Sequence, residues 1–156
     1  MVIDQAVAAG IAYMTESSQP WLRYDWFPAG HVIIKQGGRS GSLFVLKTGE
    51  MEVTRDGKFV SSVNRAGAIF GEMSVLLDQP HSASVRAVTD VEVYVIADAL
   101  RVLESHPAWT LQIARLLAQR VNSTTALLME SQLEASEKDR LVLPQNVFSQ
   151  WADPQV

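Results

Sequence analysis

The sequence lacks cysteine, contains only three histidines and has no long apolar run. Without cysteine, the chain cannot form a disulfide, a thiolate metal site or a cysteine nucleophile. No apolar stretch approaches the roughly 18 residues that a membrane-spanning helix needs, and the N-terminus has no basic region followed by an apolar signal core. The net charge of −4 argues against a strongly electropositive nucleic-acid surface. We therefore expect a soluble cytoplasmic protein with no membrane contact.

The three histidines, His31, His81 and His106, are scattered along the chain. Metal enzymes built on closed β-rolls need clustered histidines, commonly two separated by one residue, together with a carboxylate. The sequence has no such cluster, no nucleophilic serine elbow and no Gly-rich triphosphate loop. We therefore predict that the protein is not an enzyme and uses no metal or other cofactor. His31 is most simply a surface strand residue and His106 a helix end.

Length and composition favour a single domain over residues 1–156, with 47% apolar and 19% charged residues. We expect an N-terminal helix and lid over residues 1–28, strands over 29–98, helices over 99–140 and an irregular tail over 141–156. The helix of the first segment is predicted at residues 3–14. The lid is an aromatic cluster before Pro28, which comprises Trp21, Tyr24, Trp26 and Phe27.

Short segments rich in β-branched and aromatic residues predict strands in the middle of the chain. Turn signals separate them, most clearly Gly37-Gly38 and Asp56-Gly57. Many short strands with frequent turns indicate a closed roll or a sandwich. The expected strands cover residues 32–34, 43–46, 51–54, 59–60, 84–88 and 91–96.

After Asp98 the apolar spacing lengthens to that of helices. We expect a short helix that Pro107 ends, and then a long helix from Ala108 to about Lys138. Its apolar stripe consists of Ile113, Leu117, Val121, Thr124 and Leu128. The stripe is suited either to pairing with a second copy or to packing on the protein's own strands.

The most informative segment is residues 70–87, which combine a glycine, a carboxylate, one apolar helical turn and small hydroxyl residues. Gly71 permits close backbone approach, and a helical turn offers N–H donors to a phosphate. Glu72 would repel a phosphate but can accept a hydrogen bond from a sugar hydroxyl. Ser82 and Ser84 are expected to face one side of the following strand, with Ser82 nearest the phosphate.

This segment resembles the phosphate-binding cassette of cyclic-nucleotide-binding domains, the module of the catabolite activator protein and of the regulatory subunit of cAMP-dependent kinase. The resemblance covers roughly residues 20–130. It implies a mainly β fold, an eight-stranded β-roll of the jelly-roll type flanked by an N-terminal helix and C-terminal helices. The motifs that carry it are residues 27–30, 34–37, 43–49 and 67–77, in the order and spacing of that family.

The resemblance implies a sensor module for cAMP or cGMP, with its cassette at residues 70–84. It places Glu72 on the ribose 2′-hydroxyl, and backbone amides near Gly71 together with Ser82 and Ala83 on the phosphate. The long C-terminal helix would cap the base and often pairs in a homodimer. The expected ligand-binding residues are Phe70, Gly71, Glu72, Met73, Ser74, His81, Ser82, Ala83, Ser84, Thr124 and Thr125.

One position departs from the family pattern, because His81 stands where an arginine usually precedes the residue matching Ser82. Histidine is shorter and mostly neutral at pH 7. Three interpretations remain open: weak binding of cAMP or cGMP, helped by a protonated His81; binding of another small anion or nucleotide; or a degenerate scaffold or dimerisation domain. Arg86 lies roughly 13 Å along the strand from Ser82, too far to replace the arginine.

The serious rival is the sensor half of a DNA-binding regulator, in which a helix-turn-helix follows the long helix. Such a domain needs on the order of 50 residues or more. Only 16 residues follow Arg140, and they include Pro144 and Pro154. We therefore expect no direct DNA binding by this chain. The downstream protein partner is not indicated by the sequence.

Overall fold

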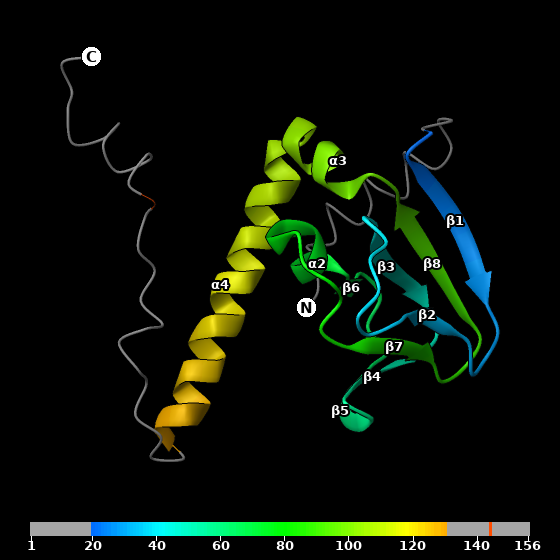
Figure 1. Ribbon diagram of the computed structural model, residues 1–156, viewed down its shortest axis with the longest axis horizontal. Helices are drawn as coiled ribbons and strands as arrows, with labels where there is room; N and C mark the ends of the chain where they lie inside the picture. Colours follow the sequence, from blue (N-terminus) through cyan, green and yellow to red (C-terminus); the bar gives the residue numbers. More distant parts are fainter. Residues whose placement is uncertain (1–19, 131–143, 145–156) are drawn as a thin grey trace. The chain divides into compact units, whose positions relative to one another are not determined.

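The computed structural model describes residues 20–130 and 144, and within them the chain forms eight strands and three helices (Figure 1). The chain divides into two compact units, Met1–Arg120 and Val121–Val156. The elements are β1 (Leu22–Phe27), β2 (Val32–Ile34), β3 (Leu43–Thr48), β4 (Met51–Arg55), β5 (Lys58–Val63), β6 (Ile69–Phe70), α2 (Glu72–Leu77), β7 (Ser84–Ala87), β8 (Val91–Ile96), α3 (Ala99–Ser105) and α4 (Pro107–Glu130).

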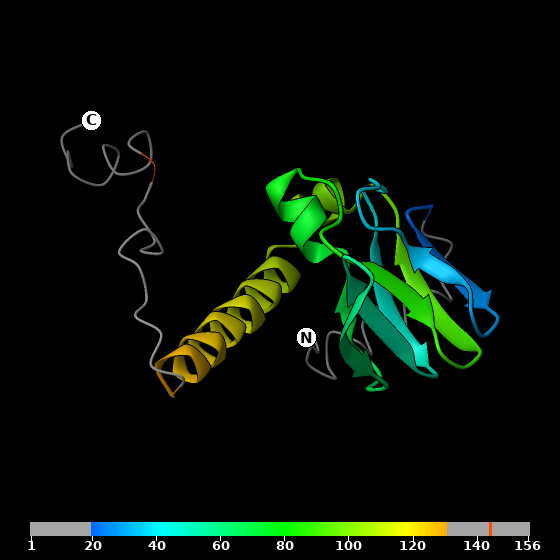
Figure 2. The ribbon, with the colours of Figure 1, turned by 60° about the horizontal axis from the view of Figure 1, so that its bottom comes forward.

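The strands form two four-stranded antiparallel sheets, in the orders β1-β8-β3-β6 and β2-β7-β4-β5. Figure 2 shows the sheets facing each other, with α2 and α3 beside one end of the strands. One apolar core joins the facing sides of the two sheets, and a second joins the first sheet to the helices. The mainly β, eight-stranded fold with flanking helices is therefore confirmed.

Side-chain alternation explains why β8 is the centre of the first sheet. Val91, Val93 and Val95 are all buried and contribute to the core between the sheets. Tyr94 and Ile96 point to the other side, where they pack with the helices. Because both faces of β8 are covered, five of its six residues are apolar, and this pattern predicted the strand correctly.

Residues 22–27, which include three of the four aromatic residues of the expected lid, form the edge strand β1 paired with β8, a strand that the sequence analysis did not predict. Aromatic side chains suit a half-exposed strand surface, and Trp26 remains 54% exposed there. β6 was missed as a separate strand because it has only two residues. Pro107 begins α4 rather than only ending the preceding helix, since proline fits the first helical position.

The apolar stripe of α4 has two different halves. Ile113 is buried, and Leu117 packs against the core of the first unit. In the second unit, Val121 is 62% exposed. Packing on the protein's own strands is thus confirmed for the first half, and pairing stays a prediction for the second. No helix within the described residues is long and apolar enough to cross a bilayer.

Some expectations concern residues outside the described ranges. These are the helix at 3–14, the extension of the long helix to Lys138, and the tail at 141–156 apart from Pro144. His31 is exposed and lies just before β2 rather than in it, with its ring stacked on Phe27 at 4.8 Å between centroids. His106 follows α3 and stacks on Trp109, as a helix-end residue.

Candidate functional site

Gly71 forms the turn between β6 and α2, and its backbone requires glycine. Its φ of 89° lies in the left-handed region, which side chains with a Cβ rarely adopt. A Cβ built on Gly71 would lie 2.8 Å from the carbonyl oxygen of Ser42. The turn therefore brings the backbone of Gly71 against the Ser42 carbonyl, and the approach of a phosphate to this glycine stays a prediction.

Glu72, the first residue of α2, has a buried carboxyl group. The residue is 6% exposed, and Arg120 Nη1 lies 3.5 Å from Glu72 Oε1, at the outer limit of a hydrogen bond. Burial raises the pKa of Glu72 above its usual 4.5, although its own backbone N–H and the Arg120 guanidinium oppose the shift. An additional hydrogen-bond donor that reaches this buried carboxylate would therefore stabilise its ionised form.

The other residues predicted in this segment, Phe70 at the end of β6 and Met73 and Ser74 in α2, differ in what they offer a ligand. Phe70 places its side chain in the core between the sheets, so only its backbone faces the turn. Met73 is exposed. The Ser74 hydroxyl donates to the carbonyl oxygen of Gln79 and closes the C-terminal end of the helix. Ser74 thus has a structural role in this arrangement.

His81 is buried at 7% exposure and held on both its backbone and its ring. Its N–H donates to Gly38 O at 2.8 Å, and its carbonyl accepts from Gly37 N–H at 2.8 Å. The ring atom Nε2 lies 3.1 Å from Ser40 Oγ, and Cε1 lies 3.7 Å from the Cβ position of Gly71. Burial lowers the pKa of His81 below 6.5, so the imidazole is neutral at pH 7.

The hydroxyl residues after His81 do not share one strand face, because β7 begins only at Ser84. Ser82 is exposed and Ala83 half-buried in the bend before that strand. The Ser84 hydroxyl accepts a hydrogen bond from the backbone N–H of Gln36 at 2.9 Å. Of the two serines, Ser82 is the one exposed beside the cassette.

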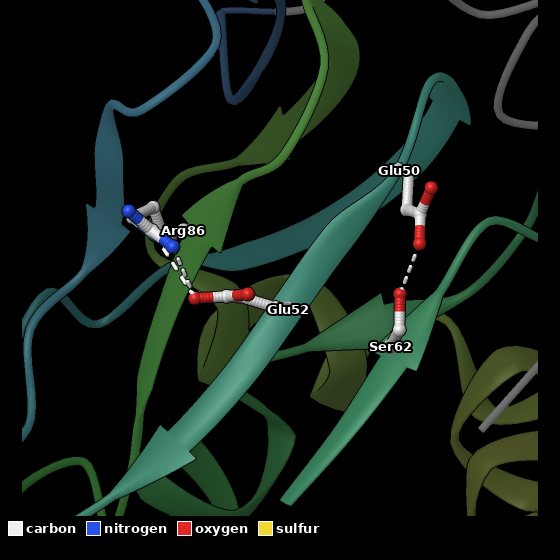
Figure 3. Close-up of polar contacts among 4 residues, drawn as sticks. All are labelled: Glu50, Glu52, Ser62 and Arg86. Atoms are coloured by element: carbon white, nitrogen blue, oxygen red, sulfur yellow. Dashed lines mark hydrogen bonds and ion pairs between the residues drawn. The ribbon is translucent and has the colours of Figure 1, made fainter. Parts of the chain in front are cut away.

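Arg86 is engaged on the outer surface of the second sheet. Its Nε donates to Glu52 Oε1 at 3.0 Å across the β4–β7 pair (Figure 3). On the same surface, the Ser62 hydroxyl donates to Glu50. Arg86 therefore pairs with Glu52 on the strand surface and does not replace the arginine that the cassette lacks. This agrees with the long separation from Ser82 that the strand spacing predicts.

Thr124 and Thr125 lie on α4 in the second unit, so their contact with a purine stays a prediction. The Thr125 hydroxyl donates to Val121 O at 2.9 Å within the same helix. No group of three or more potential metal ligands occurs among the residues that the structure describes.

The part of the site that sequence reasoning missed is the loop between β2 and β3. Gly37 and Gly38 were identified as a turn, but their two backbone hydrogen bonds to His81 join segments about forty residues apart. The same loop contributes Ser40 to the His81 ring and the Ser42 carbonyl to the Gly71 turn. The only sequence signal for this loop was the cluster of Gly37, Gly38 and Gly41, which indicates backbone conformations that favour glycine.

Comparison with known proteins identifies the same region. The family model described as cyclic nucleotide-binding domain matches residues 24–104. A cGMP-dependent protein kinase of Caenorhabditis elegans, egl-4, is 38% identical over 68 residues, which are 44% of this chain and 9% of the kinase. A cAMP-dependent protein kinase regulatory subunit of Emericella nidulans is 45% identical over 69 residues, which are 43% of this chain and 16% of the subunit.

Among solved structures, the catabolite activator protein of Thermus thermophilus superposes with a TM-score of 0.65 at 25% identity, covering 82% of this chain and 59% of that one. The matches to the two kinase proteins thus cover only a small part of those longer relatives. The family match covers more than half of this chain and contains the Gly71 turn, Glu72 and His81. The chain therefore belongs to the cyclic nucleotide-binding domain family.

Proposed function

We propose that this chain is a regulatory module of the cytoplasm that binds cAMP or cGMP weakly at residues 70–84 and acts by binding rather than by catalysis. The observation that carries the proposal is the pairing of Gly71, in the left-handed conformation, with the buried Glu72 carboxyl one residue later. Family membership and the identity to cGMP- and cAMP-dependent kinase proteins support the choice of ligand.

Each end of the segment is suited to one part of a nucleotide. The Glu72 carboxylate is desolvated and has a distant cationic partner, so a ribose hydroxyl would supply a close donor. Ser82 is exposed beside Ala83, where a hydroxyl and backbone amides can donate to the cyclic phosphate.

The proposed weakness follows from His81. A hydrogen bond from a charged group contributes about 1.5–3 kcal/mol, which corresponds to an affinity difference of about tenfold to a few hundredfold. The buried, neutral His81 does not supply this charge, and residues 70–84 contain neither arginine nor lysine. We therefore expect binding of cyclic nucleotides in the high-micromolar to millimolar range.

The test is an NMR titration of the full chain with cAMP and cGMP, with 5′-AMP as the control for the base and sugar. We expect amide shifts at Gly71, Glu72, Ser82 and Ala83, saturating for a cyclic nucleotide. His81→Arg should tighten binding by tenfold or more. His31→Arg is the matched control, because it adds the same charge at an exposed histidine.

Two results would contradict the proposal. If neither cyclic nucleotide shifts these amides at 10 mM, the cassette does not bind them and the domain is a scaffold. If His81→Arg and His31→Arg change the affinity equally, the charge acts at long range and His81 does not face the ligand.

We also propose that a second copy pairs along the C-terminal part of α4. Val121 and Leu128, seven residues apart on the predicted stripe, are 62% and 38% exposed there. Apolar side chains at helical spacing are typical of helix pairing. Light scattering of the wild type should give a dimer mass, and Val121→Lys should give a monomer. A monomeric wild type would rule out this pairing.

A further inference from the structure

The loop between β2 and β3 contacts the cassette at several separate points. The Gln36 N–H donates to Ser84 Oγ, and Gly37 and Gly38 exchange backbone hydrogen bonds with His81. Ser40 Oγ lies 3.1 Å from His81 Nε2. Farther on, the Ser42 carbonyl adjoins the Gly71 turn, and Arg39 Nη1 lies 3.0 Å from Asp78 Oδ1. The loop therefore follows the cassette from its strand to both ends of α2.

The cassette has an unfavourable charge for the ligand proposed above. Residues 70–84 contain two acids, Glu72 and Asp78, and neither lysine nor arginine. His81 is buried and hydrogen-bonded to an uncharged hydroxyl. A cyclic phosphate is a monoanion, so it would meet a net negative segment unless another part of the chain supplies a cation.

Arg39 is the cation that the loop brings to this segment. It is adjacent to Ser40, whose hydroxyl contacts the His81 ring, and that ring adjoins the Gly71 turn. The ion pair with Asp78 holds the guanidinium at the C-terminal end of α2. The six residues of α2 span about 9 Å, a distance that an arginine side chain can cover by rotating about its own Cα.

We propose that Arg39 is a phosphate-binding residue of this chain, which leaves Asp78 for the cyclic phosphate when the nucleotide binds and so compensates in part for the arginine that the cassette lacks at position 81. This inference rests on the proposed function. The exchange is feasible because the Asp78 side chain is 96% exposed and the Arg39 side chain 57%, so solvent screens the pair that must open. The same screening limits the free energy that Arg39 gains from Asp78. A bound phosphate with a fixed geometry is the better bidentate partner for the guanidinium.

The exchange predicts opposite effects of removing the two partners. Arg39→Gln removes the cation and should weaken binding of cAMP or cGMP by about three- to tenfold. Asp78→Asn releases Arg39 and should tighten binding by about two- to fivefold. Asparagine tolerates the left-handed conformation of residue 78, so this variant should fold. If the pair served only to hold the loop in place, both substitutions would break it and shift the affinity in the same direction.

Arg23 and Asp25 provide the matched control. They form a surface ion pair of the same charges on β1, at the opposite edge of the sheet from the strand that enters the cassette. Arg23→Gln and Asp25→Asn should leave the affinity unchanged within about twofold. Isothermal titration of all five proteins with cAMP and cGMP at two salt concentrations measures the effects. Raising the salt concentration should weaken nucleotide binding by the Arg39→Gln variant less than binding by the wild type.

Opposite shifts for Arg39→Gln and Asp78→Asn support the inference. Shifts of the same sign, or an Arg39→Gln affinity equal to that of Arg23→Gln, overturn it while the proposed function stands. A wild type that binds neither nucleotide overturns the proposed function and this inference together.

Discussion

Replacing Glu72 with glutamine should make the folded protein more stable while it weakens nucleotide binding. The carboxyl group is 6% exposed, and the Arg120 guanidinium that faces it at 3.5 Å has a side chain 59% open to solvent. Such a partner compensates a buried charge only in part. Glutamine has nearly the same shape and keeps one oxygen acceptor, but it carries no charge to desolvate.

The sign follows from the direction of the pKa shift. Burial raises the pKa of Glu72 in the folded state above its value of 4.5. Its contribution to stability is therefore fully present below pH 4.5, where the group is protonated in both states, and is lost as the pH rises through the folded-state pKa. Above the folded-state pKa the wild type holds a buried carboxylate, so Glu72→Gln should then raise the free energy of unfolding by about 1 kcal/mol, the low end of the cost of a poorly paired polar group.

Urea denaturation at pH 4.5, 5.5 and 7 measures this difference. The gain of Glu72→Gln over the wild type should be small at pH 4.5 and grow toward pH 7. Glu104→Gln, at an exposed position of α3, is the control and should change the free energy of unfolding by less than about 0.5 kcal/mol.

The same variant should bind cAMP or cGMP at least tenfold more weakly, since a carboxylate is a stronger acceptor than an amide. A Glu72→Gln protein that is less stable than the wild type at pH 7 would refute the reasoning, because it would show that the carboxylate is well paired in the folded state. A stabilised variant with unchanged affinity would remove Glu72 from the binding site.

Three other outcomes can be measured on the same chain. Burial lowers the pKa of His81 and a bound phosphate should raise it again, so nucleotide affinity should increase from pH 8 to pH 6 as binding takes up a proton; equal calorimetric affinities at both values would contradict this. Gly71→Ala should lower the free energy of unfolding by about 2 kcal/mol or more in urea, against about 1 kcal/mol for Gly57→Ala, which has a positive φ but no atom within 4 Å; equal losses would show that the turn relaxes. Arg120→Gln should destabilise the protein at pH 7 but not at pH 4, because only the ionised Glu72 benefits from the guanidinium, and a loss independent of pH would assign Arg120 a packing role.

Local sequence patterns were sufficient for most of the strands. β2 and β8 have the predicted bounds, because Val32–Ile34 and Val91–Ile96 are apolar runs closed by turn residues. β1 was misread because aromatic residues at its edge position are exposed, and exposure does not follow from composition. The eight-stranded closure itself came from the family resemblance and not from periodicity.

The candidate site was predictable only along the cassette. Gly71 and Glu72 stand together in sequence, and their roles as turn and buried acid could be argued from spacing. The partners of the cassette could not, because Ser40 and Ser42 reach it from a loop about thirty to forty residues away. Such contacts depend on how the two sheets pack, which no local pattern encodes.

The cassette places the left-handed turn at Gly71, which glycine adopts without strain, next to a group that costs stability in the absence of ligand, the buried carboxyl of Glu72. Neighbouring segments hold them in place, chiefly the β2–β3 loop through its hydrogen bonds to His81. A ligand that donates a hydrogen bond to Glu72 would relieve this cost. Nucleotide binding should therefore stabilise the cassette more than the sheets, and hydrogen exchange should slow most at residues 70–84.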